Sequence, residues 1–462
     1  MKISRGGAEA LRNTGRGPAN HAKRREWEEV VDYETHNIYE SSHGNFFVYF
    51  VRFVVSLRRI SFASFRVIRG QLFLLCFLLC ASAPLRETTS VRAQEPLDGA
   101  EGRPLAVDQF RPRSMLVLPE HHPAGAKFPA VDVHIHGRIK LRQTPAALDE
   151  FVRLMDDQNI AVCASLDGEL GERLEEHKRF LWTKHRARFV IFANIDWQGD
   201  GRADEPATWD CHRPDFGRRM AAALATARER GASGLKVFKD LGLAYRNPDG
   251  TLIAVDDPRW DPIWEACGKL GLPVLIHTAD PAAFFEPMDR FNERWEELHR
   301  RPEWNFAKAG FPKRAELLAA LRRVVARHPQ TQFIGAHMAN NPENLAEVGE
   351  WLDAHANLHV EISARIAELG RQPTSAREFF IKYADRILFG TDGPRDRLRL
   401  APHWRLLETR DEYFPYAEEQ YPPQGLWNIY GLDLPDEVLR KVYQGNAARL
   451  IPGVAERLED LP

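Results

Sequence analysis

Eight short apolar runs follow one another along the chain, and stretches with helical periodicity separate them. Each run is rich in Val, Ile, Leu, Phe or Ala and has the length of a buried strand. Strands that alternate with helices over roughly 260 residues are typical of a parallel barrel. We therefore predict an α/β fold, a (β/α)8 TIM barrel with a parallel eight-stranded core. The strands are expected within residues 128–136, 159–167, 188–196, 234–239, 273–277, 331–337, 358–362 and 386–392, and helices within 145–157, 213–230, 258–270, 313–327, 342–356 and 374–383.

The barrel is expected to occupy residues 128–453, with a linker at 94–127 and a tail at 454–462. Residues 1–93 form a basic leader with a signal-peptide-like segment at 57–93. Arginines precede the apolar run 72–83, and small residues follow it. This pattern predicts a secretory signal, and hence export to the periplasm or the extracellular space. Because such a signal normally begins a chain, we expect that the assigned translation start lies too far upstream.

A membrane anchor formed by residues 46–55 and 72–83 is the alternative interpretation of the leader. Membrane association is expected through this segment only. The run 72–83 is shorter than a membrane span, which needs about 20 apolar residues.

Composition excludes several other classes of protein. With 44% hydrophobic residues, 28% charged residues and a net charge of -2, the chain has ample material for a core and no basic excess for nucleic acid. Only Cys163, Cys211 and Cys267 remain after the leader, which is too few for a disulfide framework. The expected partner is a small-molecule substrate, and a homo-oligomer is left open.

Histidines and an aspartate stand at the ends of the expected strands. His134 and His136 are two residues apart, so they point to the same side of a strand and can bind one metal ion, while Val131, Val133 and Ile135 face the other way. The other three are His277, His337 and Asp392. Each alone is more often a core histidine or a turn former, but the carboxyl ends of barrel strands meet on one face. Their joint occurrence there predicts a metal site.

These residues and their surroundings resemble a known family. The order His-x-His, Lys, His, His, Asp and the sequences VDVHIH, LIHTADP, FIGAHMANNP and LFGTDGP are similar to the amidohydrolase superfamily. They resemble in particular its amidohydrolase-related branch, the aminocarboxymuconate-semialdehyde-decarboxylase-like metal-dependent hydrolases. The resemblance covers about residues 128 to 453.

The resemblance implies a role for each residue. It makes His134, His136, His277 and Asp392 ligands of a divalent metal, His337 an acid/base that handles a proton of the attacking water, and Asp392 a second proton acceptor. Lys236 stands where some members carry a carboxylated lysine that bridges two metals, although a buried structural lysine is an equal interpretation. Zinc is the expected ion, one or two according to the state of Lys236, and nitrogen and carboxylate ligands also suit manganese.

Two reactions are compatible with such a site. We expect hydrolysis of an amide, ester or lactone in a small carboxylate-bearing substrate, with non-oxidative decarboxylation of a small aromatic or unsaturated acid as the alternative. A third interpretation is an envelope-associated binding protein in which the metal is not catalytic. Arg138 and Asn340, close behind metal-site histidines, are the expected substrate contacts. The aromatic segments 280–311 and 394–434 are expected to cover the site or to pack against the barrel.

Overall fold

The structure is a computed structural model that describes residues 99–110, 112–393, 397–417 and 427–460. The chain divides into two units, 1–116 and 117–462. In the first unit, the described residues contain the short 3-10 turns Ala100–Gly102 and Val107–Gln109. The leader and its predicted signal lie outside the described residues. In the part of the chain that is described, no helix is both long and apolar enough to cross a bilayer.

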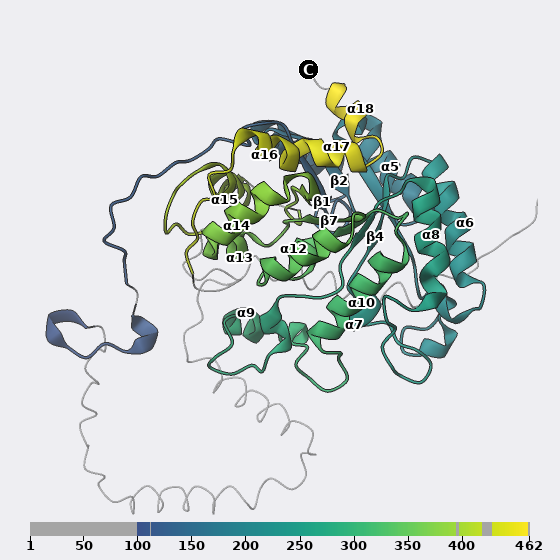
Figure 1. Cartoon of the computed structure of the whole chain (residues 1–462), viewed down its shortest axis with the longest axis horizontal. Helices are drawn as coiled ribbons and strands as arrows, with labels where there is room; N and C mark the ends of the chain where they lie inside the picture. The colour runs from purple at the N-terminus through teal and green to yellow at the C-terminus, as the bar shows by residue number, and fades with distance from the viewer. Residues whose placement is uncertain (1–98, 111, 394–396, 418–426, 461–462) are drawn as a thin grey trace, which may run out of the picture. The chain divides into compact units, whose positions relative to one another are not determined.

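The second unit contains eight parallel strands that follow one another in sequence order around a barrel, which confirms the predicted fold (Figure 1). The last strand lies beside the first, because the Val133 amide donates to the Phe389 carbonyl at 3.0 Å. The strands are shorter than the apolar runs that predicted them. They are β1 Ala130–Ile135, β2 Ile160–Ser165, β3 Phe189–Asn194, β4 Gly234–Val237, β5 Val274–Ile276, β6 Phe333–Gly335, β7 Leu358–Glu361 and β8 Ile387–Leu388.

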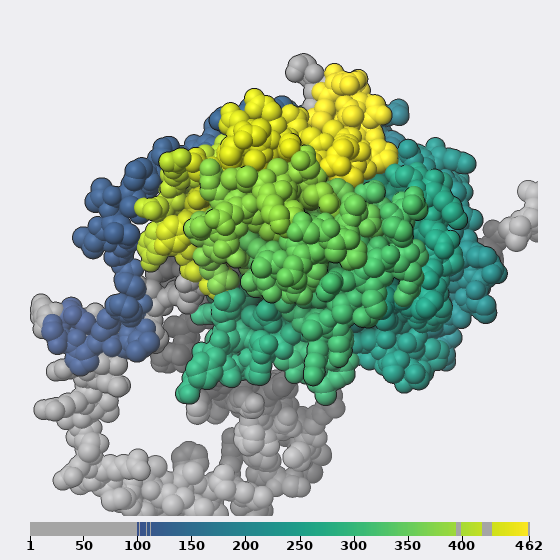
Figure 2. Space-filling model, in the orientation of Figure 1, coloured from purple at the N-terminus to yellow at the C-terminus, as the bar shows by residue number. Residues whose placement is uncertain are grey.

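Helices cover the outside of the strands. The longer ones are α4 Pro145–Asp157, α5 Gly171–His185, α6 Phe216–Glu229, α8 Asp261–Leu270, α10 Arg314–Arg327, α12 Leu345–Ala354, α14 Pro373–Lys382 and α15 Arg397–Glu408. Sequence signals explain their ends: the Thr144 side chain accepts from the Ala147 amide at the start of α4, and Gly271 ends α8 with a φ of 63°. In the same orientation, Figure 2 shows the green segments as a continuous surface of side chains on this face.

Alternate strand residues pack into two apolar clusters, as expected for a barrel with an outer and an inner face. The larger cluster joins strand residues such as Leu235 and Val237 to the helices, so Lys236 between them faces the interior of the barrel. On β1 the alternation is interrupted. Val131 and Val133 belong to the inner cluster but Ile135 to the outer one, since the pairing with β2 shifts register between Asp132 and Ile135. The prediction that these three share one side was wrong.

The carboxyl-terminal segment contributes to the inner cluster. Ala447 and Ile451 pack there with strand residues, in and just after α17 Asn446–Leu450. Residues 454–462, expected as a tail, contain the further helix α18 Val454–Glu459. Val454 is fully buried, and Arg457 Nε donates to the Phe189 carbonyl at 2.9 Å. The packed part of the chain therefore continues beyond residue 453.

One buried histidine of the barrel makes stability depend on pH. His359 on β7 is 2% exposed, and neither ring nitrogen has a hydrogen-bond partner in the described part of the chain. Burial lowers the pKa of His359 from 6.5 to about 3. The unfolded chain therefore binds the proton first, and stability falls as the pH drops below 6.5.

We predict that His359→Phe reduces the acid sensitivity of the fold. Between pH 7.5 and 5.0, linkage assigns to His359 a loss of about 2 kcal/mol in the free energy of unfolding, which the variant should not show. Urea unfolding at the two pH values measures the difference. His299→Phe, at an exposed histidine of α9 Trp295–Arg300, is the control and should behave as the wild type. Equal acid sensitivity of His359→Phe and the wild type would contradict the prediction.

Candidate metal centre

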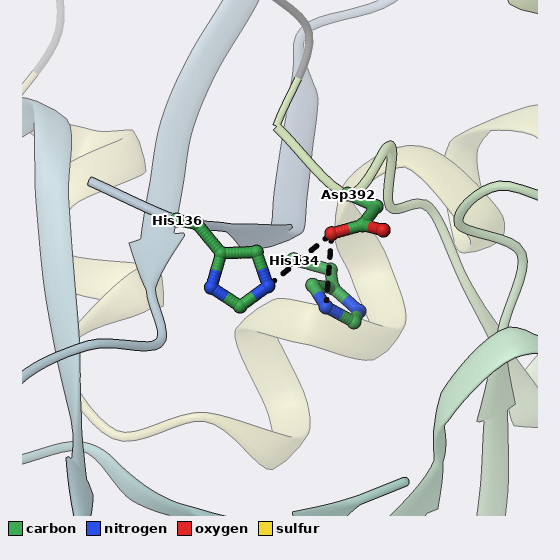
Figure 3. A group of neighbouring side chains, drawn as sticks. All are labelled: His134, His136 and Asp392. Atoms are coloured by element: carbon green, nitrogen blue, oxygen red, sulfur yellow. Dashed lines mark ion pairs between the residues drawn. The ribbon is translucent and has the colours of Figure 1, made fainter. Parts of the chain in front are cut away.

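The ends of β1 and β8 bring three predicted ligands together (Figure 3). His134 Nε2 lies 3.6 Å and His136 Nε2 lies 3.2 Å from the same oxygen, Asp392 Oδ1. Asp392 follows β8 in the left-handed region, with a φ of 65°, and the next amide, of Gly393, donates to the His134 carbonyl at 3.1 Å. Because the three ligand atoms lie within 4.8 Å of one another, one metal ion can contact all of them.

Two further carboxylates orient these imidazoles. His134 Nδ1 donates to Glu361 Oε1 at 3.0 Å, and His136 Nδ1 donates to Asp167 Oδ1 at 2.7 Å. A ring whose Nδ1 carries the donated proton presents the Nε2 lone pair, which is the arrangement that metal-binding histidines require. This observation shows that the residues present fit a divalent metal ion.

Sequence analysis did not assign Glu361 and Asp167 to the site. Both stand at or just after the carboxyl end of a predicted strand, β7 and β2, where a buried acid is a signal for a site residue. Sequence analysis also did not assign Lys140, which follows β1 and whose Nζ lies 2.8 Å from Asp392 Oδ1. Position in the barrel was a usable signal for the two acids, but the contact of Lys140 depends on the course of a loop.

Burial and hydrogen bonds set the charge of the three ligands. Burial, with a contribution from Lys236, lowers the pKa of His134 well below its ordinary value, so this ring is neutral. Burial also lowers the pKa of His136, but hydrogen bonds with Asp167 and Asp392 outweigh it and raise the pKa, so a metal ion would bind Nε2 in place of the proton shared with Asp392. For Asp392, burial raises the pKa, yet the His136 hydrogen bond and the Lys140 charge hold it well below the ordinary value. Asp392 is therefore an anionic ligand.

His277 and His337 complete the cluster. Their ring centroids lie 4.4 Å apart, and the His337 ring lies 5.0 Å from that of His134. His277 Nε2 donates to the Ala279 carbonyl at 2.9 Å and lies 3.4 Å from Asp280 Oδ1, which leaves Nδ1 as the nitrogen that can bind a metal. His337 Nδ1 donates to the Ser363 carbonyl at 2.9 Å, so its Nε2 carries the lone pair. The ring contacts thus place His277 against His337 and His337 against His134. Among the described residues, no group of three or more ligand atoms within 4.8 Å of one another includes His277, so its role as a ligand stays a prediction.

An unusual backbone segment positions His337. Residues 337–340 all have φ between 52° and 58°, a left-handed turn in which no glycine takes part. Each such residue costs on the order of 1 to 3 kcal/mol and persists only where neighbours hold it. Here the His337 amide donates to Glu361 Oε1 at 2.8 Å, and Asn340 Oδ1 accepts from the Thr278 amide at 3.0 Å. The turn therefore fixes His337 next to the ligands.

Lys236 is buried at the centre of the barrel. Its side chain is 2% exposed, and its Nζ has no hydrogen-bond partner in the described part of the chain. Burial lowers the pKa of Lys236 to about 8. The ammonium lies 5.4 Å from the centroid of the Phe238 ring, which in turn stacks on His136 at 5.9 Å. A buried amine without a hydrogen-bond partner is compatible with a lysine that becomes carboxylated. The contact with the Phe238 ring is compatible with an unmodified cation. Both interpretations of Lys236 therefore stay open.

The two predicted substrate contacts are held by the protein itself. Arg138 donates through Nε to the Asp167 carbonyl at 3.2 Å and through Nη2 to the Arg173 carbonyl at 2.7 Å. Asn340 is fully buried against Thr278, although its Nδ2 has no partner among the described residues. In this structure both residues support the loops around the site, and their contact with a substrate stays a prediction.

A known protein family matches most of the chain. The family model for Amidohydrolase matches residues 131–453, and no curated protein matches the chain. Solved structures of similar fold include a 2,6-dihydroxybenzoate decarboxylase from Rhizobium, with 16% identity over 71% of this chain and 98% of that chain and a TM-score of 0.40. The 5-carboxyvanillate decarboxylase of Sphingomonas paucimobilis is 15% identical over 68% and 84%, with a TM-score of 0.37. A probable 2-pyrone-4,6-dicarboxylic acid hydrolase from Acinetobacter baumannii is 13% identical over 58% and 86%, with a TM-score of 0.32.

At these identities and TM-scores the solved structures support no assignment, and the family assignment rests on the family model. That match runs from β1 to beyond α17 and includes all five residues of the cluster. The resemblance seen in the sequence is thereby confirmed, and the chain is a metal-dependent enzyme of the amidohydrolase family.

Proposed function

We propose that this enzyme hydrolyses an amide, ester or lactone bond in a small carboxylate-bearing molecule. One observation carries the proposal: His134 Nε2 and His136 Nε2 both face Asp392 Oδ1, while carboxylates hold both Nδ1 atoms. A divalent metal ion held by these residues and His277 would polarise the scissile carbonyl and lower the pKa of an attacking water from about 15.7 to about 7. We propose zinc, and the donor set also suits manganese.

His337 is the group best suited to accept a proton from the water. Burial and the adjacent His277 hold the pKa of His337 well below its ordinary value, so the ring is neutral at pH 7. Its Nδ1 is engaged by Ser363, and Nε2 is the nitrogen that can accept. Asp392 is a weaker base, because the Lys140 ammonium 2.8 Å away favours its ionised form. We therefore assign proton transfer mainly to His337 and metal binding to Asp392.

Decarboxylation of a small aromatic or unsaturated acid is the second candidate. The contact of Lys236 with the Phe238 ring is compatible with it, because an aromatic ring stabilises the unmodified cation. An unmodified lysine cannot bridge two metals, since an ammonium has no lone pair. The site would then hold one ion, the state in which both reactions remain open.

We predict that His134→Ala and His337→Ala separate metal binding from catalysis. His134→Ala should lose the metal and all activity, because it removes a ligand. His337→Ala should keep the metal and lose on the order of 100-fold or more in kcat, the usual contribution of an acid/base. Metal content after dialysis, measured by plasma mass spectrometry, is the readout. His185→Ala on α5, whose ring bonds to Asp149, is the control that should keep both. Full turnover by His337→Ala would refute its assignment.

A second prediction concerns the reaction. Metal-loaded enzyme should release protons from small lactones and esters that bear a carboxylate, or ammonia or an amine from the corresponding amides, and should release no carbon dioxide from hydroxybenzoic acids. A pH indicator measures the protons, a colorimetric amine assay measures the ammonia or amine, and a carbon dioxide electrode measures the carbon dioxide. Carbon dioxide release without hydrolysis would replace the proposed function by the second candidate.

The state of Lys236 has a separate readout. The intact mass of the native protein, compared with that of Lys236→Met, shows whether a carboxyl group is attached. If the lysine is modified, the adduct should occur together with two metal ions per chain. Lys236→Met should then lose the adduct and the second ion. An adduct with one ion would contradict the bridging role.

A further inference from the structure

Arg365 stands near the metal centre on the carboxyl side of β7. This part of the chain supplies Glu361, which holds His134, and Ser363, whose carbonyl accepts from His337 Nδ1 at 2.9 Å. Ala364 then turns the chain with a φ of 52°, and Arg365 precedes α13 Ile366–Arg371. Arg365 therefore lies two residues beyond Ser363, whose carbonyl holds the His337 ring. A substrate that reaches His337 therefore approaches Arg365.

The guanidinium of Arg365 is buried without a paired acid. The residue is 5% exposed, and the described part of the chain places no carboxylate within 4.0 Å of its nitrogens. Its Nη1 donates to the Ala364 carbonyl at 2.7 Å, whereas its Nε has no partner among the described residues. Removing a charge from water is costly unless an opposite charge and hydrogen bonds replace the water. A planar guanidinium is suited to bind a carboxylate through two parallel hydrogen bonds.

Other arginines in this region do have paired acids. Arg294, which is 1% exposed, contacts Glu368 and donates to Glu297 Oε2 at 2.8 Å. Arg371 donates to Glu293 at 2.9 Å.

Arg314 likewise donates to Glu343 at 2.8 Å. Arg365 also helps to lower the pKa of Glu368, but Arg294 is the larger of the two charges that do so, and Arg365 makes no hydrogen bond to that acid. Longer-range attraction to Glu368 leaves the hydrogen-bonding capacity of Arg365 unused.

We propose that Arg365 binds the carboxylate of the substrate and orients the reacting bond toward the metal ligands and His337. This inference rests on the proposed function for the identity of the reaction, but it assigns a recognition residue that hydrolysis by itself does not require. The acid would supply the hydrogen-bonded carboxylate that Arg365 lacks among the described residues, since Glu297 and Glu368 act on it only at longer range. Arg365 is then a specificity residue for anionic over neutral molecules of equal shape.

Binding of matched acids and amides tests the proposal without turnover. The probes are benzoate with benzamide and pentanoate with pentanamide, titrated calorimetrically into the metal-loaded full chain. The wild type should prefer the acid by at least 10-fold in one pair or both, and Arg365→Met should lose this preference. Arg371→Met, which removes an arginine already paired with Glu293, is the control and should retain it.

Two results would overturn the role of Arg365. A wild type that shows no preference for either acid overturns the proposal, because no group then recognises the carboxylate. An Arg365→Met variant that keeps the preference also overturns it, because the metal alone would then account for the preference. If Arg365→Met does not fold, as judged by circular dichroism, Arg365→Lys takes its place. That variant keeps the charge but not the planar donor pair, so a reduced preference supports the proposal and an unchanged one overturns it.

Failure of this inference differs from failure of the proposed function. Hydrolysis without a preference for acids removes only the role of Arg365. A preference for acids without hydrolysis removes only the proposed reaction.

Discussion

The carboxylate of Glu361 is the interaction on which the geometry of the site depends. It is fully buried and accepts from His134 Nδ1, from the His337 amide, and from both the amide and the hydroxyl of Ser363, at 2.6 to 3.0 Å. These contacts join the ends of β1, β6 and β7 at one point. A buried carboxylate satisfied by several donors fixes its neighbours, since any displacement would leave a charge without partners. The tautomer of His134 and the position of His337 both follow from this one side chain.

A similar link joins β1 to β8. The Asp132 carboxylate accepts from the amides of His134 and Thr391 at 3.0 and 3.1 Å and also contacts the Thr391 hydroxyl. Thr391 immediately precedes Asp392, so this link sets the distance between that ligand and the β1 histidines. The metal centre therefore depends on buried acids that connect neighbouring strands, as well as on the ligands themselves.

Sequence reasoning reached the fold and the five-residue cluster because both follow from periodicity. Alternating strands and helices predict a barrel, and the carboxyl ends of its strands meet on one face, where His277, His337 and Asp392 were expected. It did not reach Glu361, Asp167 or Lys140, because periodicity locates a strand end without showing which hydrogen bonds form there. It also missed the register shift within β1. Asn340 illustrates the same limit, since the left-handed turn that directs it toward Thr278 depends on φ angles that a sequence pattern does not specify.

The central claim is that a divalent ion binds at the mouth of the barrel to residues from β1 and from the chain after β8. Anomalous diffraction from crystals of the zinc-loaded protein measures this directly. The account predicts a peak in contact with His134 Nε2, His136 Nε2 and Asp392 Oδ1, at about 2.0 to 2.2 Å from each. A zinc peak elsewhere in the molecule, with no peak between these three side chains, would contradict it.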